Sequence, residues 1–67
     1  MKNTLLASAG TLSDIEKLTS KFYCGMRVTI EMAAGHGFVR RHSDGKILEG
    51  VTICLKKGRY RLEMVSA

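Results

Sequence analysis

Basic residues in the second half of the chain are the side chains whose type and spacing most clearly suggest a chemistry. Between positions 40 and 61, seven of them are opposed only by Asp44 and Glu49. A dense cationic surface attracts polyanions, because binding releases condensed counterions. We therefore expect contact with nucleic acid through a cationic β-sheet face. The candidate phosphate-contacting residues are Arg40, Arg41, Lys46, Lys56, Lys57, Arg59 and Arg61.

Two other readings of this basic surface remain open. It could dock an acidic protein, the chain then acting as an interaction module or an inhibitor. It could also be only a solvated β surface, where Lys and Arg discourage edge-to-edge aggregation. The sequence contains no RNP-like aromatic motif, no zinc-finger spacing and no helix-turn-helix pair. Tyr60 lies between two arginines and could stack on a base, but its strand pattern places it inward.

Four residues of metal-ligand type are spaced C-x11-H-x5-H-x11-C, namely Cys24, His36, His42 and Cys54. Structural zinc sites usually take ligand pairs from tight C-x2–4-C or H-x3–5-H knuckles. Only the histidine pair approaches such a spacing, so we expect no metal and no other cofactor. Two cysteines are also too few for a disulfide-stapled mini-protein, which favours free thiols and a reducing compartment.

Size and composition limit the class of protein further. The chain has 67 residues, 45% of them hydrophobic and 25% charged, with no proline, which is typical of one small folded domain. The carboxylates are scattered, and so short a chain rarely encloses a substrate pocket, so we expect no enzyme and no small-molecule substrate. The apolar run near the start is too short for a signal peptide or a membrane span, which favours the cytoplasm and no membrane partner.

The clearest local pattern is a helix over residues 14–24. Ser13 and Glu16 match a capping box, and Gly25 is a typical stop residue. Ile15, Leu18 and Phe22 form the expected buried stripe. Residues 1–12 have no clear period and are expected to be a loosely ordered arm or a docking segment.

From residue 25 onward the period changes to two, which predicts strands over residues 27–32, 38–42, 46–56 and 59–65. The Asp44-Gly45 turn predicts a two-residue loop that pairs Arg40 with Glu49. The Lys57-Gly58 turn pairs Leu55 with Tyr60. It also pairs the apolar residues that precede Leu55 with those that follow Tyr60. Gly50 is expected to kink the third strand.

These elements predict an α+β fold, with one short helix packed on a four-stranded antiparallel meander. The alternative is a small, partly closed SH3-like or OB-like barrel. Exposed edges at residues 27–32 and 59–65 suggest a homodimer that pairs such edges. Small size, basic character and a capped helix leading into a meander are typical of accessory or regulatory proteins of phages and mobile elements.

Overall fold

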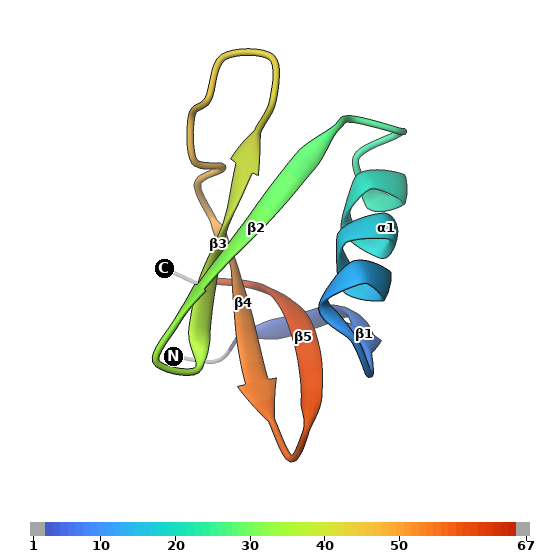
Figure 1. Ribbon diagram of the computed structural model, residues 1–67, viewed down its shortest axis with the longest axis vertical. Coiled ribbons are helices and arrows are strands. Elements are labelled where there is room, and N and C mark those ends of the chain that lie inside the picture. Colours follow the sequence, from blue (N-terminus) through green and yellow to red (C-terminus); the bar gives the residue numbers. More distant parts are fainter. Residues whose placement is uncertain (1–2, 66–67) are drawn as a thin grey trace.

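A computed structural model describes residues 3–65 of the chain. The strands form one antiparallel sheet in the order β1-β5-β4-β3-β2, and the helix packs on it (Figure 1). The α+β class is therefore confirmed, with five strands in place of the four predicted. The elements are β1 (Thr4–Ala9), α1 (Leu12–Phe22), β2 (Val28–Ala33), β3 (His36–Arg41), β4 (Val51–Lys56) and β5 (Arg59–Met64).

The sheet does not close into a barrel, because β1 and β2 are its two edges and do not pair. Helix α1 contacts β1, β2 and β5 and so lies between the two edges (Figure 1). Its Glu16 carboxylate accepts a hydrogen bond from the backbone N–H of Ile30 in β2, at 3.1 Å. A helix side chain thus satisfies a donor on the free edge of the sheet, where a closed barrel would use a fifth strand pairing.

Strand β1 is the element that the sequence pattern missed. It pairs with β5 from Thr4 opposite Met64 to Ala9 opposite Tyr60, with an irregular register between Leu5 and Ala7. A bulge of this kind breaks the two-residue alternation by which a strand is recognised. As a consequence β5 is an inner strand, and the expected edge at residues 59–65 is wrong, whereas β2 is an edge as expected. Positions 1 and 2 of the predicted arm lie outside the described residues.

The helix begins two residues earlier than predicted. Thr11 is the N-cap, and its hydroxyl accepts from the backbone N–H of Asp14 at 3.1 Å. The predicted capping box is therefore wrong, because Ser13 lies inside the first turn and Glu16 is bound to the edge of β2. The helix ends near the predicted stop, with Gly25 at a φ of 87°.

The buried stripe of the helix also differs from the expected one. Ile15 and Thr19 are fully buried, whereas Leu18 and Phe22 are 38% and 46% exposed. Thr19 satisfies its hydroxyl by donating to the backbone carbonyl of Ile15 at 2.7 Å. The helix turns this face to β1, β2 and β5, and Ile15 joins the core cluster there.

The β4–β5 hairpin has the predicted register. Leu55 lies opposite Tyr60 and Ile53 opposite Leu62, around the Lys57-Gly58 turn. Tyr60 is half-buried and packs against the core, as the strand pattern predicted.

The β3–β4 connection is longer than predicted. Arg40 lies opposite Ile47 instead of Glu49, and β4 begins only after Gly50. Asp44 explains the wider loop, since its carboxylate accepts from the Lys46 backbone N–H and binds the Arg41 side chain.

The core lies between α1 and the concave inner face of the sheet. Fully buried Ile15 meets Val39, Ile53 and Leu62 there, with Ala9 and Ile30 at the sides. Gly37 is required in β3, because a Cβ at this position would lie 2.3 Å from the sulfur of Met32 and 2.8 Å from a backbone oxygen. Within residues 3–65 no helix has the length and apolar character needed to cross a membrane.

The cap assignment is directly testable by mutation. We expect Thr11→Ala to lower the free energy of unfolding by about 1 kcal/mol, because it leaves a helix N–H without its acceptor. The matched variant Ser13→Ala should change it by a few tenths at most. Urea denaturation of both proteins measures the difference, and a larger loss for Ser13→Ala would restore the predicted capping box.

Candidate functional site

The outer face of the sheet is the surface that the helix leaves open. In the β4–β5 hairpin, Ile53 and Leu62 point to the core, so the alternating pairs point outward. These outward pairs are Thr52 with Glu63, Cys54 with Arg61, and Lys56 with Arg59. On β3 the outward positions include His36, which lies opposite Cys54.

The structure divides the seven predicted basic residues between two ends of the sheet. Arg40, Arg41 and Lys46 belong to the β3–β4 connection, and the other four belong to the β4–β5 hairpin. These two connections lie at opposite ends of the molecule (Figure 1). The seven residues therefore do not form one continuous patch.

At the β3–β4 end, the arginines are largely neutralised. Arg40 forms a two-pronged ion pair with Glu31, at 3.1 and 3.2 Å, and Arg41 forms another with Asp44, at 2.6 and 3.0 Å. The Arg41 hydrogen bond, helped by the Lys46 backbone N–H, holds the pKa of Asp44 below its usual value. Asp44 keeps its charge, and the two ion pairs weaken the local field of the arginines.

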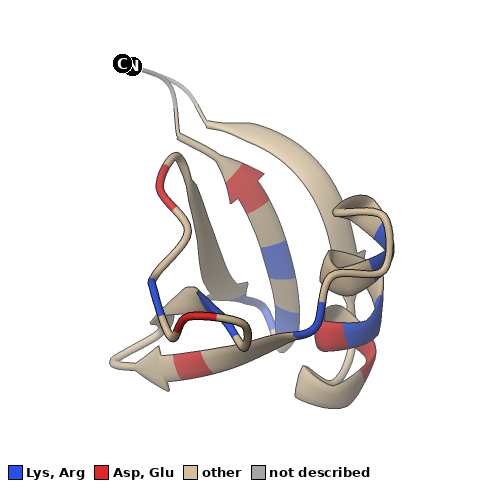
Figure 2. Ribbon diagram, turned by 90° about the horizontal axis from the view of Figure 1, so that it is seen from above, with Lys and Arg blue, Asp and Glu red and all other residues tan. Residues whose placement is uncertain are grey.

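At the β4–β5 end, the charges are less compensated. The four basic residues here, Lys56, Lys57, Arg59 and Arg61, are called the hairpin cations below. Arg61 pairs with Glu63 at 2.9 Å, and the other three form no ion pair with any described residue. Lys56 and Arg59 lie directly opposite each other, and Lys57 is in the turn with a φ of 51°. Arg59 is oriented by its Nε, which donates to the Ser8 hydroxyl at 3.2 Å. Figure 2 shows the basic segments along β5.

A nearly buried carboxylate underlies the hairpin cations. Glu63 is only 5% exposed and accepts from Arg61 at 2.9 Å, from Asn3 at 3.0 Å and from the Cys54 thiol at 3.6 Å. The hydrogen bonds from Arg61 and Asn3 hold the pKa of Glu63 below its usual value. Burial, and then the charge of Glu63, raise the pKa of Cys54, which keeps this sulfur protonated near neutral pH. The network fixes Arg61 in the middle of the outer face.

The four candidate metal ligands are not brought together. His36 lies opposite Cys54, but Cys24 follows the far end of α1 and His42 contacts the Thr29 hydroxyl beyond β3. In the described part of the chain, no three His, Cys, Asp or Glu residues are grouped so as to hold a metal ion. Both cysteines are free thiols, Cys24 exposed and Cys54 buried.

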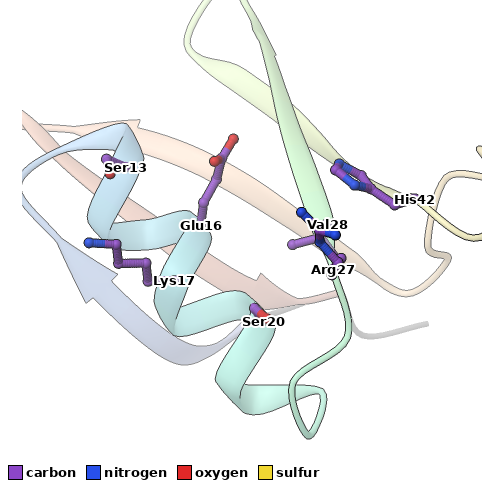
Figure 3. A pocket seen from close by; sticks show the side chains of 7 residues that line it. All are labelled: Ser13, Glu16, Lys17, Ser20, Arg27, Val28 and His42. Atoms are coloured by element: carbon purple, nitrogen blue, oxygen red, sulfur yellow. The ribbon is translucent and has the colours of Figure 1, made fainter.

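A hollow of about 270 Å³ lies where α1 meets the start of β2 (Figure 3). Glu16 points across it toward β2 and is already engaged by the Ile30 backbone. Lys17 extends along the helix, away from Arg27 and His42 on the other side. The cationic groups that line the hollow do not converge on one point, as the binding of a small anion would require.

Comparisons with known proteins do not assign a function to either surface. No protein-family model, curated protein or solved structure matches this chain. Of the outer face and the hollow beside α1, only the outer face combines several cations with an aromatic ring. That ring, Phe38, is 51% exposed and was not singled out from the sequence. The alternation of β3, with Gly37 and Val39 buried, is the signal that would have placed it outside.

The Glu63 network predicts a pH dependence of stability. Because the folded-state pKa is below the unfolded value of ~4.3, the carboxylate stabilises the fold above that pH. This contribution is lost as the pH falls through the folded-state pKa. We expect Glu63→Gln to unfold more easily than the parent at pH 7, with a difference that shrinks by pH 3.

Urea denaturation at pH 7, 5, 4 and 3 measures this difference. Asp44→Asn is the matched control, since Asp44 also has a lowered pKa but lies in an exposed loop pair. Its effect should be smaller at pH 7. A difference between Glu63→Gln and the parent that is independent of pH would contradict the assigned pKa shift.

Proposed function

We propose that the protein is a small, non-enzymatic binding protein that contacts nucleic acid through the hairpin cations on the outer face of its sheet. The observation that carries the proposal is the direct pairing of Lys56 with Arg59, neither of which forms an ion pair with a described residue. Like charges directly opposite one another destabilise a sheet. A bound phosphate would remove that repulsion, which gives the arrangement a physical purpose.

The surroundings of this pair support the same proposal. Arg61 follows Arg59 on the same face and keeps a side-chain exposure of 36% despite its ion pair. Lys17 of α1 lines a shared hollow with Arg59 at the end of β1, together with Asp14, so this edge adds one further cation and one carboxylate. A run of separate cations suits a polyanion, whose contacts fix its position without reading its sequence.

The opposite end of the sheet contributes less in this proposal. Arg40 and Arg41 are each held by a carboxylate, so a phosphate would have to displace an existing two-pronged ion pair. Lys46 is exposed but isolated from the hairpin cations by the length of β4. The set of seven residues is thereby reduced to four principal ones.

Neutralising the central pair tests the proposal. Lys56→Gln with Arg59→Gln should weaken binding to a labelled 20-base-pair duplex and reduce the log–log salt slope by about 1.8, at ~0.9 per phosphate contact. The control, Lys21→Gln with Lys46→Gln, removes the same charge elsewhere and should retain most of the affinity. Fluorescence anisotropy from 25 to 300 mM salt measures both. Equal losses in the two double variants would show that net charge, not this site, drives binding.

A protein partner is the second candidate, and the open edge of β2 favours it. Backbone groups on such an edge can pair with another strand, from an acidic protein or from a second copy of this chain. We therefore keep a homodimer as the expected assembly. Sedimentation at 10–300 µM measures it: a concentration-dependent shift to twice the monomer mass supports pairing, and a monomer throughout excludes the dimer.

The state of the cysteines supports placement in a reducing compartment. Cys54 is buried against Glu63, and Cys24 is exposed, and the two do not form a disulfide with each other. We accordingly propose the cytoplasm as the working location, where such thiols persist.

A further inference from the structure

Phe38 is an aromatic side chain on the outside of a sheet, where its exposure has no packing explanation. Its exposed fraction, 51%, is the highest among the large hydrophobic side chains of residues 3–65. It lies on β3, which is flanked by β2 and β4, and not on an edge strand. Val39, the next residue, is fully buried on the other face. The ring therefore stands on the open face while its strand contributes to the core.

Planar polar side chains flank this ring along the strand. His36 and Arg40 lie two residues before and after Phe38 and share its face, at a spacing of roughly 7 Å along β3. An imidazole, a phenyl ring and a guanidinium thus follow one another on one surface. All three groups can stack on nucleobases. Gly37 lies between His36 and Phe38. It must lack a side chain because β3 lies close to its neighbouring strands here.

The hairpin cations lie on the same face within reach of this row. His36 is opposite Cys54, and Cys54 is opposite Arg61, so the arginine is two strands away, roughly 10 Å. Arg59 and Lys56 continue the positive charge beyond Arg61. Rings and cations are therefore separated by a distance that a short stretch of one nucleic-acid strand can span.

We propose that the partner of the outer face is single-stranded nucleic acid, with one base stacked on Phe38 and its neighbours stacked on His36 or Arg40. The backbone then runs over β4 and β5, where the hairpin cations contact phosphates. This inference rests on the proposed nucleic-acid function and adds that the bound nucleic acid is single-stranded. A duplex keeps its base faces stacked internally, so it can use the cations but not the ring.

Glu31 determines on which side of the sheet the bases and the backbone of the bound strand lie. It lies directly opposite Phe38 on β2 and binds Arg40. Its carboxylate offsets the charge of Arg40, so along Val28–Ala33 the β2 side has no unpaired cation to attract phosphate, whereas β4 and β5 do attract it. The bases accordingly point toward β2 and β3, and the backbone lies over β4 and β5.

A protein partner fits this part of the face less well. Docking of proteins favours a contiguous apolar patch, yet the side chains next to Phe38 on its face are His36, Arg40 and Glu31. Ile47, opposite Arg40, is an exposed apolar neighbour on the diagonal and would extend the platform for a base. A single ring between polar and charged neighbours suits stacking better than it suits a hydrophobic interface.

The test compares strands and rings in one anisotropy assay at 50 mM salt. The probes are labelled 12-mers of U, of dT and of a dT·dA duplex. Phe38→Leu should weaken binding to the single strands about tenfold, because stacking on an aromatic ring is lost. Binding to the duplex should change less than twofold. Phe38→Tyr, which keeps the ring, should bind like the parent.

Phe22→Leu is the matched control, since Phe22 is also exposed, at 46%, but lies at the end of α1. It should leave all three affinities unchanged. Glu31→Gln should tighten single-strand binding severalfold, because it frees the positive charge of Arg40. A second readout uses Phe38→Trp: the parent chain contains no tryptophan, and stacking should quench this unique fluorophore on single strands but not on duplex.

The outcomes separate the two levels of the proposal. Salt-sensitive binding that is equal for single strands and duplex, with no effect of Phe38→Leu, would overturn the inference and leave the cationic contact standing. No binding to any probe at low salt would overturn both and point to an acidic protein instead. A preference for U over dT, or the reverse, with the Phe38 effect retained, supports the inference and shows that the strand is also distinguished by its sugar or by the thymine methyl group.

Discussion

The structure depends on a sheet that curves but does not close, so that its two edge strands need a third element between them. Helix α1 supplies it, burying Ile15 completely against β-strand side chains and extending Glu16 to the Ile30 backbone. The carboxylate does for one edge amide what a neighbouring strand would do. Because the apolar residues face this helix, the other face of the sheet is left to solvent and to polar side chains.

On that outer face, electrostatics are organised by carboxylates at different depths. Glu63 lies beneath the surface and is saturated by hydrogen bonds from Arg61, Asn3 and Cys54. It therefore orients an arginine while leaving part of that side chain exposed. Glu31 and Asp44 instead lie at the surface and offset the arginines that they bind. The same residue types thus produce a compensated end and a cationic end.

The local patterns of the sequence predicted much of the fold, and the proposed site only in part. The β4–β5 register followed from the Lys57-Gly58 turn, because any slip would place charges in the core. The β3–β4 register did not follow from Asp44-Gly45, since the Asp44 side chain closes a wider loop. The basic residues were recognisable as a set, but whether each meets a carboxylate depends on strands distant in sequence.

What the sequence determined by itself was the class of fold, the helix, the meander of strands and the excess of positive charge. These features arise from periodicity, turn residues and composition, all of which act over a few neighbouring positions. The tertiary structure alone decided that β1 pairs with β5, that Thr11 caps the helix, and that Phe38 lies exposed on the outer face. Each of these depends on contacts between segments far apart in the chain, whose energies no local pattern contains.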